Sequence, residues 1–332
     1  MPSLSIIVPL FNERDSIPGL LRELREAMAE EELQALFAVP FSYEIIIIDD
    51  GSTDDSATIL TGITNTAPEV RLVSMQRNYG KTAALSTGFG IASGDYICTI
   101  DADLQDDPFA IKTMIRTLQD GSDLVSGWKV ERHDPLTKTI PSRFFNAVTR
   151  TVTGISIHDF NCGLKVYRQQ VVRHLHLHGD MHRYIPVLAE RMGFRIAEVP
   201  VRHRARQHGQ SKYGTYRLFT GLFDFLSVLF ITRYIGRPMH FFGMAGLCCF
   251  FSGFLISLTV TIEKLAFMKP AGNRPILFLG ILLIILGVQL FSTGLIGEML
   301  SASTAETIPR IIRATANLDP EQQQRCSGSL QS

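Results

Sequence analysis

The stretch YICTIDADLQ, residues 96–105, joins an apolar, strand-like run to two carboxylates and an amide. Residues 96–100 predict a buried β-strand, and Asp101 and Asp103 follow at its carboxyl end. Mg²⁺ prefers oxygen ligands and usually takes only one or two carboxylates from a protein, completing its shell with water and phosphate oxygens. The stretch therefore predicts a divalent-cation site that serves a nucleotide diphosphate. For an isolated Asp-x-Asp pair the alternative is a solvated acidic turn before the helix opened by Pro108, and the motifs below outweigh it.

Strand-like and helical patterns alternate through the first part of the chain. The predicted strands are residues 4–10, 43–48, 70–75, 96–100 and 123–126, and the helical patterns begin at residue 16 and cover 56–66, 81–92 and 108–120. Four consecutive isoleucines at 45–48 are typical of a central strand covered on both sides. The alternation predicts a doubly wound α/β domain with a mostly parallel sheet. Ligands bind beyond the carboxyl ends of such strands, where Asp49, Asp50, Asp101 and Asp103 fall.

Charge and cysteine content narrow the classes of function. The chain of 332 residues has 32 basic and 32 acidic residues, and this balance argues against a nucleic-acid partner. Its five cysteines form no Cys-x-x-Cys pair, so a disulfide framework or a zinc site is not expected and the domain fits a reducing compartment. The first residues, MPSLS, run directly into a strand without a signal-peptide pattern. We therefore expect this domain in the cytoplasm.

Two later stretches, residues 239–262 and 276–297, contain no Asp, Glu, Lys or Arg. A membrane span needs about 20 apolar residues to cross roughly 30 Å of hydrocarbon, and both stretches exceed that length. They predict two transmembrane helices, at about 239–262 and 275–298 within the region 237–300. The short connection makes them a hairpin, and basic residues slightly favour both termini on the cytoplasmic side. The predicted location is the inner, cytoplasmic membrane, with a multi-pass anchor.

The segments around the hairpin complete the predicted organisation. The α/β domain is expected over residues 1–212. Residues 213–236 carry apolar side chains at helical spacing with arginines near the ends, which predicts an amphipathic helix lying on the membrane surface, with a core helix of the soluble domain as the alternative. Residues 301–332 are expected to form a cytoplasmic tail, partly disordered because its end is rich in Gln and Ser.

Two further motifs follow predicted strands. In DDGSTD, residues 49–54, an acid can accept hydrogen bonds from a base or a ribose hydroxyl; helix capping accounts for Ser52 and Asp54 but not for Asp50. In QRNYGK, residues 76–81, two cations precede a helix whose positive N-terminus favours an anion, which predicts contact with a diphosphate, with surface solvation as the alternative.

Other motifs are weaker. The glycines at 88, 90 and 94 have the wrong spacing for a dinucleotide fingerprint and end a helical pattern. Histidines 174, 176, 178 and 182 invite a metal site, but we interpret them as a polar edge because no carboxylate follows at ligand spacing. The turn DFNCG at 159–163 adds a third acidic site, which could serve an acceptor.

Six different short segments follow one another over residues 4 to about 215. They are IVPLFNE at 7–13, DDGS at 49–52, RNYGK at 77–81, DADLQDDP at 101–108, DFNCG at 159–163 and RQHGQSKY at 206–213. This set resembles the family-two glycosyltransferases, and within them the dolichol- and polyprenyl-phosphate sugar transferases of the GT-A fold. The apolar hairpin is similar to that of the bacterial branch, which carries two such helices.

The resemblance implies roles by position. It implies a nucleoside site at Pro9, Phe11, Glu13 and Asp50, further donor contacts at Lys81, Asp101, Ala102 and Lys129, and Mg²⁺ or Mn²⁺ on Asp103 and Gln105. Arg206 and Lys212 would hold phosphates of the donor or the lipid. Phe11 stands where the family often has Tyr, and Lys129 where it often has Arg, which leaves the base and the sugar open.

The sequence thus predicts an inverting transfer of a sugar from a UDP- or GDP-linked donor to a membrane polyprenyl phosphate. The catalytic residues would be Asp103, Asp159, Arg206 and Lys212, with a homo-oligomer left open. One alternative is a processive polysaccharide synthase, but those enzymes carry a Gln-x-x-Arg-Trp segment, and the only tryptophan here is Trp128. Another is a non-catalytic nucleotide-binding scaffold, which would not need an intact metal set.

Overall fold

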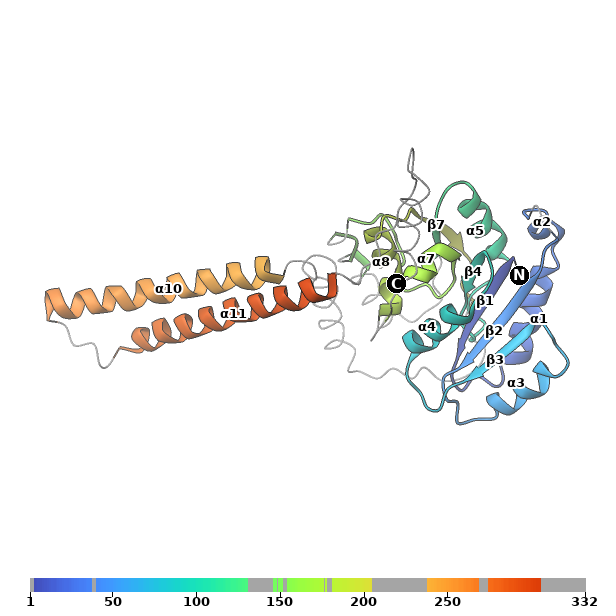
Figure 1. Ribbon diagram of the computed structural model, residues 1–332, viewed down its shortest axis with the longest axis horizontal. Coiled ribbons are helices and arrows are strands. Elements are labelled where there is room, and N and C mark those ends of the chain that lie inside the picture. The colour runs from blue at the N-terminus through green and yellow to red at the C-terminus, as the bar shows by residue number, and fades with distance from the viewer. Residues whose placement is uncertain are drawn as a thin grey trace, which may run out of the picture. The chain divides into compact units, whose positions relative to one another are not determined.

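The computed structural model describes residues 3–37, 40–130, 146–147, 149–151, 154–175, 177, 181–204, 238–268 and 274–305 (Figure 1). The chain divides into two compact units, Met1–Phe225 and Leu226–Ser332, and each is described by itself. The predicted surface helix at 213–236 and the predicted tail beyond residue 305 lie outside the described residues, as do Arg206 and Lys212.

A seven-stranded sheet in the order β3-β2-β1-β4-β6-β5-β7 forms the centre of the first unit. The strands are β1 (Leu4–Leu10), β2 (Tyr43–Asp49), β3 (Val70–Ser74), β4 (Tyr96–Thr99), β5 (Leu124–Lys129), β6 (Lys165–Arg168) and β7 (Ile196–Val201). Only β6 is antiparallel to its neighbours β4 and β5, and the other pairs in this described sheet are parallel. The predicted mostly parallel sheet is confirmed, with β6 and β7 added to the five predicted strands.

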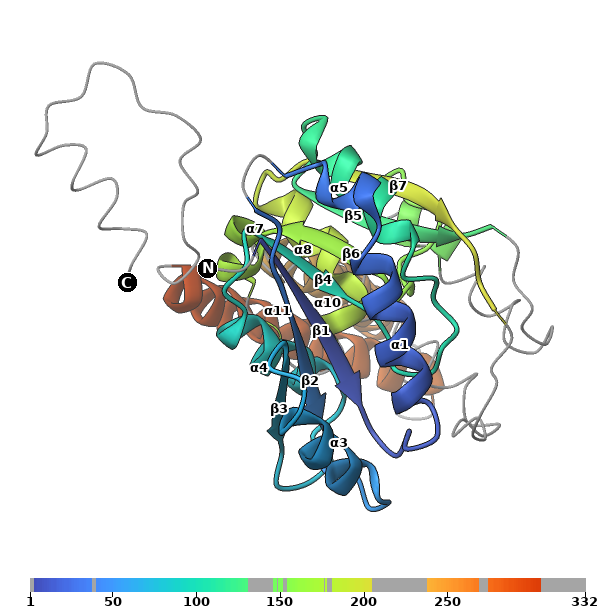
Figure 2. The same ribbon diagram turned by 90° about the vertical axis from the view of Figure 1, so that its right-hand side faces the viewer.

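Short helices connect the strands and cover the sheet. They are α1 (Ile17–Met28), α2 (Glu31–Gln34), α3 (Ser56–Thr64), α4 (Lys81–Ile91), α5 (Ala110–Gln119), α7 (Gln169–His174), the 3-10 turn η1 (Met181–Tyr184) and α8 (Ile185–Arg191). The four predicted helical patterns correspond to α1, α3, α4 and α5. Figures 1 and 2 show α1 and α4 on opposite sides of β1.

The alternation of side chains along β1 explains the two covered faces. Leu4, Ile6 and Val8 join a core cluster with the apolar residues of α1 and α5, whereas Ile7 points to α4 on the other face. A Cβ at Gly88 of α4 would lie 2.4 Å from Cγ2 of Ile7, so this glycine lets the helix approach the sheet closely. Gly88 therefore serves the packing of α4 on the sheet, whereas an added Cβ at Gly90 would meet nothing within 4 Å.

Gly62 occupies an open position on α3, where an added Cβ would meet nothing within 4 Å. We expect Gly62→Ala to raise the free energy of unfolding by about 0.5–1 kcal/mol, because alanine reduces the conformational freedom of the unfolded chain. Thermal unfolding of the detergent-solubilised protein, followed by circular dichroism, measures this change. A lower midpoint in the variant would contradict the expectation.

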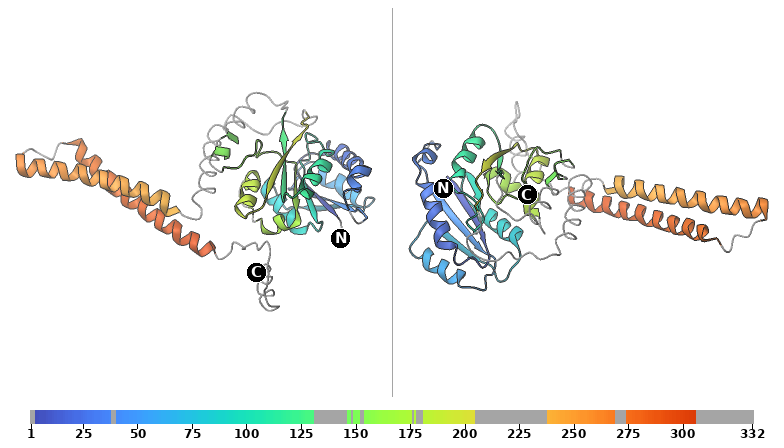
Figure 3. Two further views of the ribbon diagram at one scale, coloured as in Figure 1. Left: turned by 90° about the horizontal axis from the view of Figure 1, so that it is seen from above. Right: turned by 180° about the vertical axis from the view of Figure 1, so that it is seen from behind.

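The second unit contains two long apolar helices, α10 (Pro238–Phe267) and α11 (Pro275–Ala305). They run antiparallel and side by side (Figure 3). Both are long and apolar enough to cross a membrane, so the two predicted apolar helices are present, each longer than its predicted span, and both are candidate membrane spans.

Glycines bring the two helices of the hairpin close together. A Cβ at Gly246 would lie 2.7 Å from the carbonyl oxygen of Gly287, and one at Gly253 would lie 2.5 Å from that of Gly280. Small residues at such crossings let helix backbones pack tightly in an apolar medium. The large apolar side chains of the hairpin point away from this seam and are exposed, as expected for a surface that faces lipid.

Candidate active site

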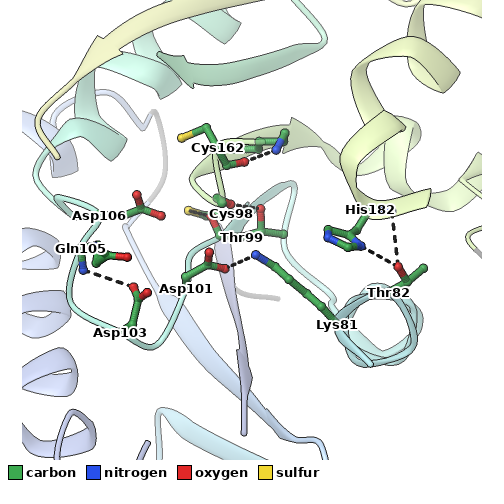
Figure 4. Close-up of polar contacts among 12 residues, drawn as sticks. Lys81, Thr82, Cys98, Thr99, Asp101, Asp103, Gln105, Asp106, Cys162 and His182 are labelled. Atoms are coloured by element: carbon green, nitrogen blue, oxygen red, sulfur yellow. Dashed lines mark hydrogen bonds and ion pairs between the residues drawn. The ribbon is translucent and has the colours of Figure 1, made fainter. Parts of the chain in front are cut away.

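The predicted acidic residues gather at one edge of the sheet, as the sequence indicated. β1, β2 and β4 are parallel, so their carboxyl ends lie together, with Leu10 of β1 opposite Asp49 of β2. Asp50 follows β2, and Asp101 and Asp103 follow β4. Figure 4 shows the part of this edge that follows β4.

Asp101 forms a tight ion pair with the first residue of α4. The ammonium of Lys81 lies 2.5 Å from Oδ1 of Asp101. Burial alone would raise the pKa of Asp101, but Lys81 lowers it to about 2, so the carboxylate stays charged. On the other side, a Cβ at Gly163 would lie 2.4 Å from Oδ2 of Asp101. Asp101 therefore lies between the ammonium of Lys81 and the backbone of Gly163.

Asp103 and Gln105 are presented by an unusual turn. Leu104 between them has a φ of +60°, a conformation that costs roughly 1 kcal/mol or more for a non-glycine residue, and its side chain is buried against Gly19. The side-chain nitrogen Nε2 of Gln105 donates a hydrogen bond to the carbonyl oxygen of Arg204 at 3.3 Å. The side-chain oxygen Oε1 is therefore the atom of Gln105 that can bind a metal. The buried leucine fixes a turn that presents the two predicted metal ligands.

The carboxyl group of Asp103 holds its proton more tightly than usual. Burial, together with repulsion from Asp101 and Asp106, raises its pKa to about 6. A divalent cation would relieve this repulsion, and proton and metal would compete for the same oxygens. The residues present therefore fit a metal whose remaining ligands come from phosphate and water.

This competition predicts a pH dependence of metal binding. Below the pKa of about 6 the protonated form of Asp103 dominates, so we expect the apparent affinity for Mn²⁺ to weaken as the pH falls through that value, approaching about tenfold per pH unit. Calorimetric titration with Mn²⁺ on either side of this pH measures it. The variant Asp103→Asn, which cannot titrate, should bind Mn²⁺ weakly on both sides of this pH and without the dependence. An affinity of the wild type that is independent of pH would contradict the assignment.

Lys129, predicted to contact the donor, lies in a second ion pair. Its ammonium is 2.7 Å from Oδ1 of Asp106, which is 2% exposed. Burial alone would lower the pKa of Lys129, but Asp106 raises it, so the lysine stays charged. Asp106 was not among the predicted site residues, although it directly follows the Asp101–Gln105 segment.

Asp50 holds the loop that precedes α4. Its two carboxylate oxygens accept hydrogen bonds from the backbone N–H groups of Tyr79 and Gly80, at 2.7 and 2.8 Å. Gly51 next to it has a φ of +70°, and a Cβ there would lie 2.4 Å from the carbonyl carbon of Arg77. Asp50 therefore orients the segment that carries Lys81, while its predicted contact with the nucleoside stays a prediction.

The predicted nucleoside residues of β1 lie next to this loop. Pro9 is opposite Ile48 in the sheet, and Phe11 and Glu13 follow the end of β1. Their contacts with a nucleoside stay predictions, as does that of the buried Ala102 with the donor.

The loop after β1 is tied to the loop after β2. The backbone N–H of Asn12 donates to Oγ of Ser52 at 2.9 Å, so Ser52 joins two loops and the capping explanation for it is wrong. Asp54 accepts a hydrogen bond from the backbone N–H of Ser56, the first residue of α3, but the N-cap position is Asp55 and its side chain makes no capping hydrogen bond.

The turn at 158–163 connects the site to β7. Glu198 of β7 accepts hydrogen bonds from the backbone N–H groups of His158 and Asp159, at 3.0 and 2.9 Å. Asp159 is 1% exposed, and its Oδ1 accepts from the backbone N–H of Asn161. The same turn continues to Gly163 beside Asp101, so Asp159 and Glu198 position the wall of the site; sequence reasoning did not find Glu198.

The histidines do not gather around a common point in the described part of the chain. Nδ1 of His174 contacts the carbonyl oxygen of Gln170, whereas Nδ1 of His182 lies 2.8 Å from Oγ1 of Thr82. Among the described residues, no group of three or more His, Cys, Asp or Glu side chains could hold a metal ion. A metal on Asp103 therefore depends on Gln105 and on phosphate oxygens.

Comparison with known proteins identifies the family. The sequence model described as Glycosyl transferase family 2 matches residues 5–175. Dodecaprenyl-phosphate galacturonate synthase of Rhizobium johnstonii is 39% identical over 305 residues, which cover 90% of this chain and 87% of that protein. Undecaprenyl-phosphate 4-deoxy-4-formamido-L-arabinose transferase of Pseudomonas aeruginosa is 33% identical over 331 residues, covering 97% and 94%.

Solved structures support the fold. Glucosyl-3-phosphoglycerate synthase of Mycobacterium tuberculosis, in complex with Mn²⁺ and UDP-glucose, has a TM-score of 0.51 and 20% identity, covering 70% of this chain and 79% of that one. The same enzyme with UDP gives the same TM-score. Because the family model spans the strands that build the site and the relatives extend over most of the chain, the protein belongs to glycosyl transferase family 2 and is a glycosyltransferase of the GT-A fold.

Proposed function

We propose that this glycosyltransferase moves a sugar from a UDP- or GDP-linked donor to a polyprenyl phosphate, with inversion at the anomeric carbon. The observation that carries the proposal is the arrangement of Asp103 and Gln105 on a rigid turn beside the Asp101–Lys81 pair, at the edge where such sheets bind ligands. Two relatives, identical to this chain at 39% and 33% of positions, are named for sugar transfer to polyprenyl phosphates, which supports the acceptor class.

The proposed metal is Mg²⁺ or Mn²⁺ on Asp103 and Gln105. When bound, it would act as a Lewis acid that stabilises the negative charge of the departing nucleoside diphosphate. Lys81, at the start of α4, provides a cation and a helix N-terminus on the same side of the site. Arg206 and Lys212 are proposed to hold phosphates of the donor or the lipid. Asp50 orients the loop before Lys81 by accepting hydrogen bonds from its backbone N–H groups.

The proposed reaction is a direct displacement. An oxygen of the lipid phosphate bonds to the anomeric carbon while the bond from that carbon to the diphosphate oxygen breaks, and the nucleoside diphosphate leaves. A phosphate monoester has a second pKa of about 6, so the acceptor is largely dianionic near neutral pH and needs no strong general base. Positioning and charge stabilisation then account for most of the catalysis.

Asp159 is the proposed residue for positioning the acceptor, with a modest base role as the alternative. Asp159→Asn keeps an oxygen that can accept from the N–H of Asn161, so it removes the charge and preserves the turn. We expect this variant to retain most activity and Asp159→Ala to lose more, because the alanine variant frees the turn. If Asp159→Asn is as inactive as the alanine variant in the lipid-product assay, Asp159 acts as a base.

The hairpin supports a membrane location for the reaction. Lipid-facing apolar surface on α10 and α11 would anchor the enzyme beside its lipid substrate. We propose the cytoplasmic face of the inner membrane, with the catalytic domain in the cytoplasm and the segment 213–236 on the membrane surface.

Radiolabelled nucleotide sugars incubated with enzyme-containing membranes and undecaprenyl phosphate test the proposal. Extraction should recover a lipid-linked monosaccharide whose formation stops when EDTA is added and resumes with Mn²⁺. An insoluble polymer would indicate a processive synthase instead, and absence of any product with the whole donor panel would contradict catalysis of this kind.

A further inference from the structure

A small, partly open pocket lies beside Asp101, between the start of α4, strand β6 and the turn η1. Four basic side chains line it, Lys81, Lys165, His182 and Arg183, and no carboxylate is among its described lining residues. The free space at its centre is about 10 Å³, close to the room that one water-sized atom needs. The proposed mechanism uses only Lys81 of these four residues.

Lys165 is the most unusual member of this group. It lies in β6, is 4% exposed, and donates a hydrogen bond to the carbonyl oxygen of Cys162. Burial lowers its pKa, as expected for an ammonium without an adjacent counter-charge. Asp159 and Asp101 are the acids that act on it electrostatically, neither forms an ion pair with it, and Asp101 is already paired with Lys81 at 2.5 Å. An ammonium buried in this way is unfavourable unless an anion joins it.

His182 lies close to the same cations, and they affect its protonation. Nδ1 of its ring lies 2.8 Å from Oγ1 of Thr82 on α4 (Figure 4). Burial, and then repulsion by Lys81, Arg183 and Lys165, lowers its pKa to about 3, so the imidazole is neutral at physiological pH. The lining of the pocket therefore carries the charges of two lysines and an arginine, and the acids that act on Lys165, Asp101 and Asp159, are not among its described lining residues.

We propose that this pocket binds a carboxylate of the donor sugar, so that the transferred sugar is a hexuronic acid. The inference rests on the proposed function and specifies its donor. Asp101 lies between Asp103 and Lys81 (Figure 4), so a donor whose diphosphate sits at Asp103 has its sugar next to this pocket. Lysine and arginine give strong charge-assisted hydrogen bonds to carboxylate oxygens. The narrow space suits the end of a planar carboxylate better than a tetrahedral lipid phosphate.

The test uses matched donors that differ only at C6, with the full-length enzyme in membranes and undecaprenyl phosphate as acceptor. The pairs are UDP-galacturonate with UDP-galactose, UDP-glucuronate with UDP-glucose, and GDP-mannuronate with GDP-mannose. In at least one pair we expect kcat/KM to favour the uronate by about 100-fold or more, because a site built to hydrogen-bond a group rejects the analogue that lacks it. Equal or faster transfer of the neutral hexoses overturns the inference and leaves the proposed function standing. Failure of every donor contradicts both.

Variants show whether the pocket causes the preference. Arg183→Gln and Lys165→Gln should each lower kcat/KM for the preferred uronate by about tenfold or more, without a matching loss for the neutral hexose. Arg173→Gln, at an exposed position of α7, is the matched control and should behave as wild type. If Lys165→Gln does not fold, the half-buried Arg183 carries the test. A raised KM for undecaprenyl phosphate with an unchanged donor ratio would place the lipid phosphate in the pocket and overturn the inference.

Discussion

Asp103→Ala is expected to lower kcat/KM for sugar transfer by roughly 10²–10³-fold, since one electrostatic group in such a site is worth on the order of 3–4 kcal/mol in the barrier. The buried Leu104 holds the turn that presents Asp103 beside Asp101, and the raised pKa of Asp103 marks a carboxylate that lacks a counter-charge. The loss should persist at saturating Mn²⁺ and saturating donor. Initial rates of lipid-linked sugar formation provide the measurement.

The control for this variant is an acid outside the site. Asp120 is exposed at the end of α5, and Asp120→Asn should leave the rate unchanged. Asp103→Asn, which keeps the shape of the side chain, should fail nearly as badly as the alanine variant because it removes the only carboxylate charge assigned to the metal, leaving two neutral amide oxygens. Activity of Asp103→Asn close to wild type would remove the metal-binding role.

The second large effect is expected from a single added methyl group. A Cβ at Gly163 would lie 2.4 Å from Oδ2 of Asp101, whose other oxygen is paired with Lys81. Gly163→Ala must therefore displace the carboxylate or the turn that faces it. Since a shift of about 1 Å in a positioned group can cost roughly 10²-fold in rate, we expect a loss of that order.

This loss should occur without unfolding. Gly62→Ala adds the same methyl group at a position with nothing within 4 Å and is the matched control. Gly163→Ala should still unfold cooperatively near the wild-type midpoint and Gly62→Ala at or above it, and only Gly163→Ala should lose kcat/KM. Gly163→Ala with full activity would show that the position of Asp101 does not limit the reaction.

The strands that could be predicted from the sequence are those built from apolar runs. β1 has its predicted bounds, and β2 to β5 begin or end within a few residues of theirs. β6 has only four residues and begins and ends with a cation, Lys165 and Arg168, so it has no apolar run to reveal it. β7 contains Glu198 and Pro200, residue types that argue against a central strand.

The residues of the site also fall into those that the sequence could locate and those that it could not. The sequence located Asp101 and Asp103 because acids that follow parallel strands must meet at one edge. It could not identify the partners of those acids, because pairs such as Asp50 with the N–H of Gly80 join residues that are distant along the chain. Ser52 was interpreted by its local sequence and instead binds Asn12, and the buried Lys165 has no signature in its neighbours.

The position of a bound metal tests whether Asp103 holds the cation that serves the diphosphate. Crystals of the protein grown with Mn²⁺ and a nucleoside diphosphate should show an anomalous peak within about 2.5 Å of a carboxylate oxygen of Asp103, with diphosphate oxygens completing its shell. A diphosphate bound without a metal, with Asp103 turned away from it, would rule out this role of Asp103.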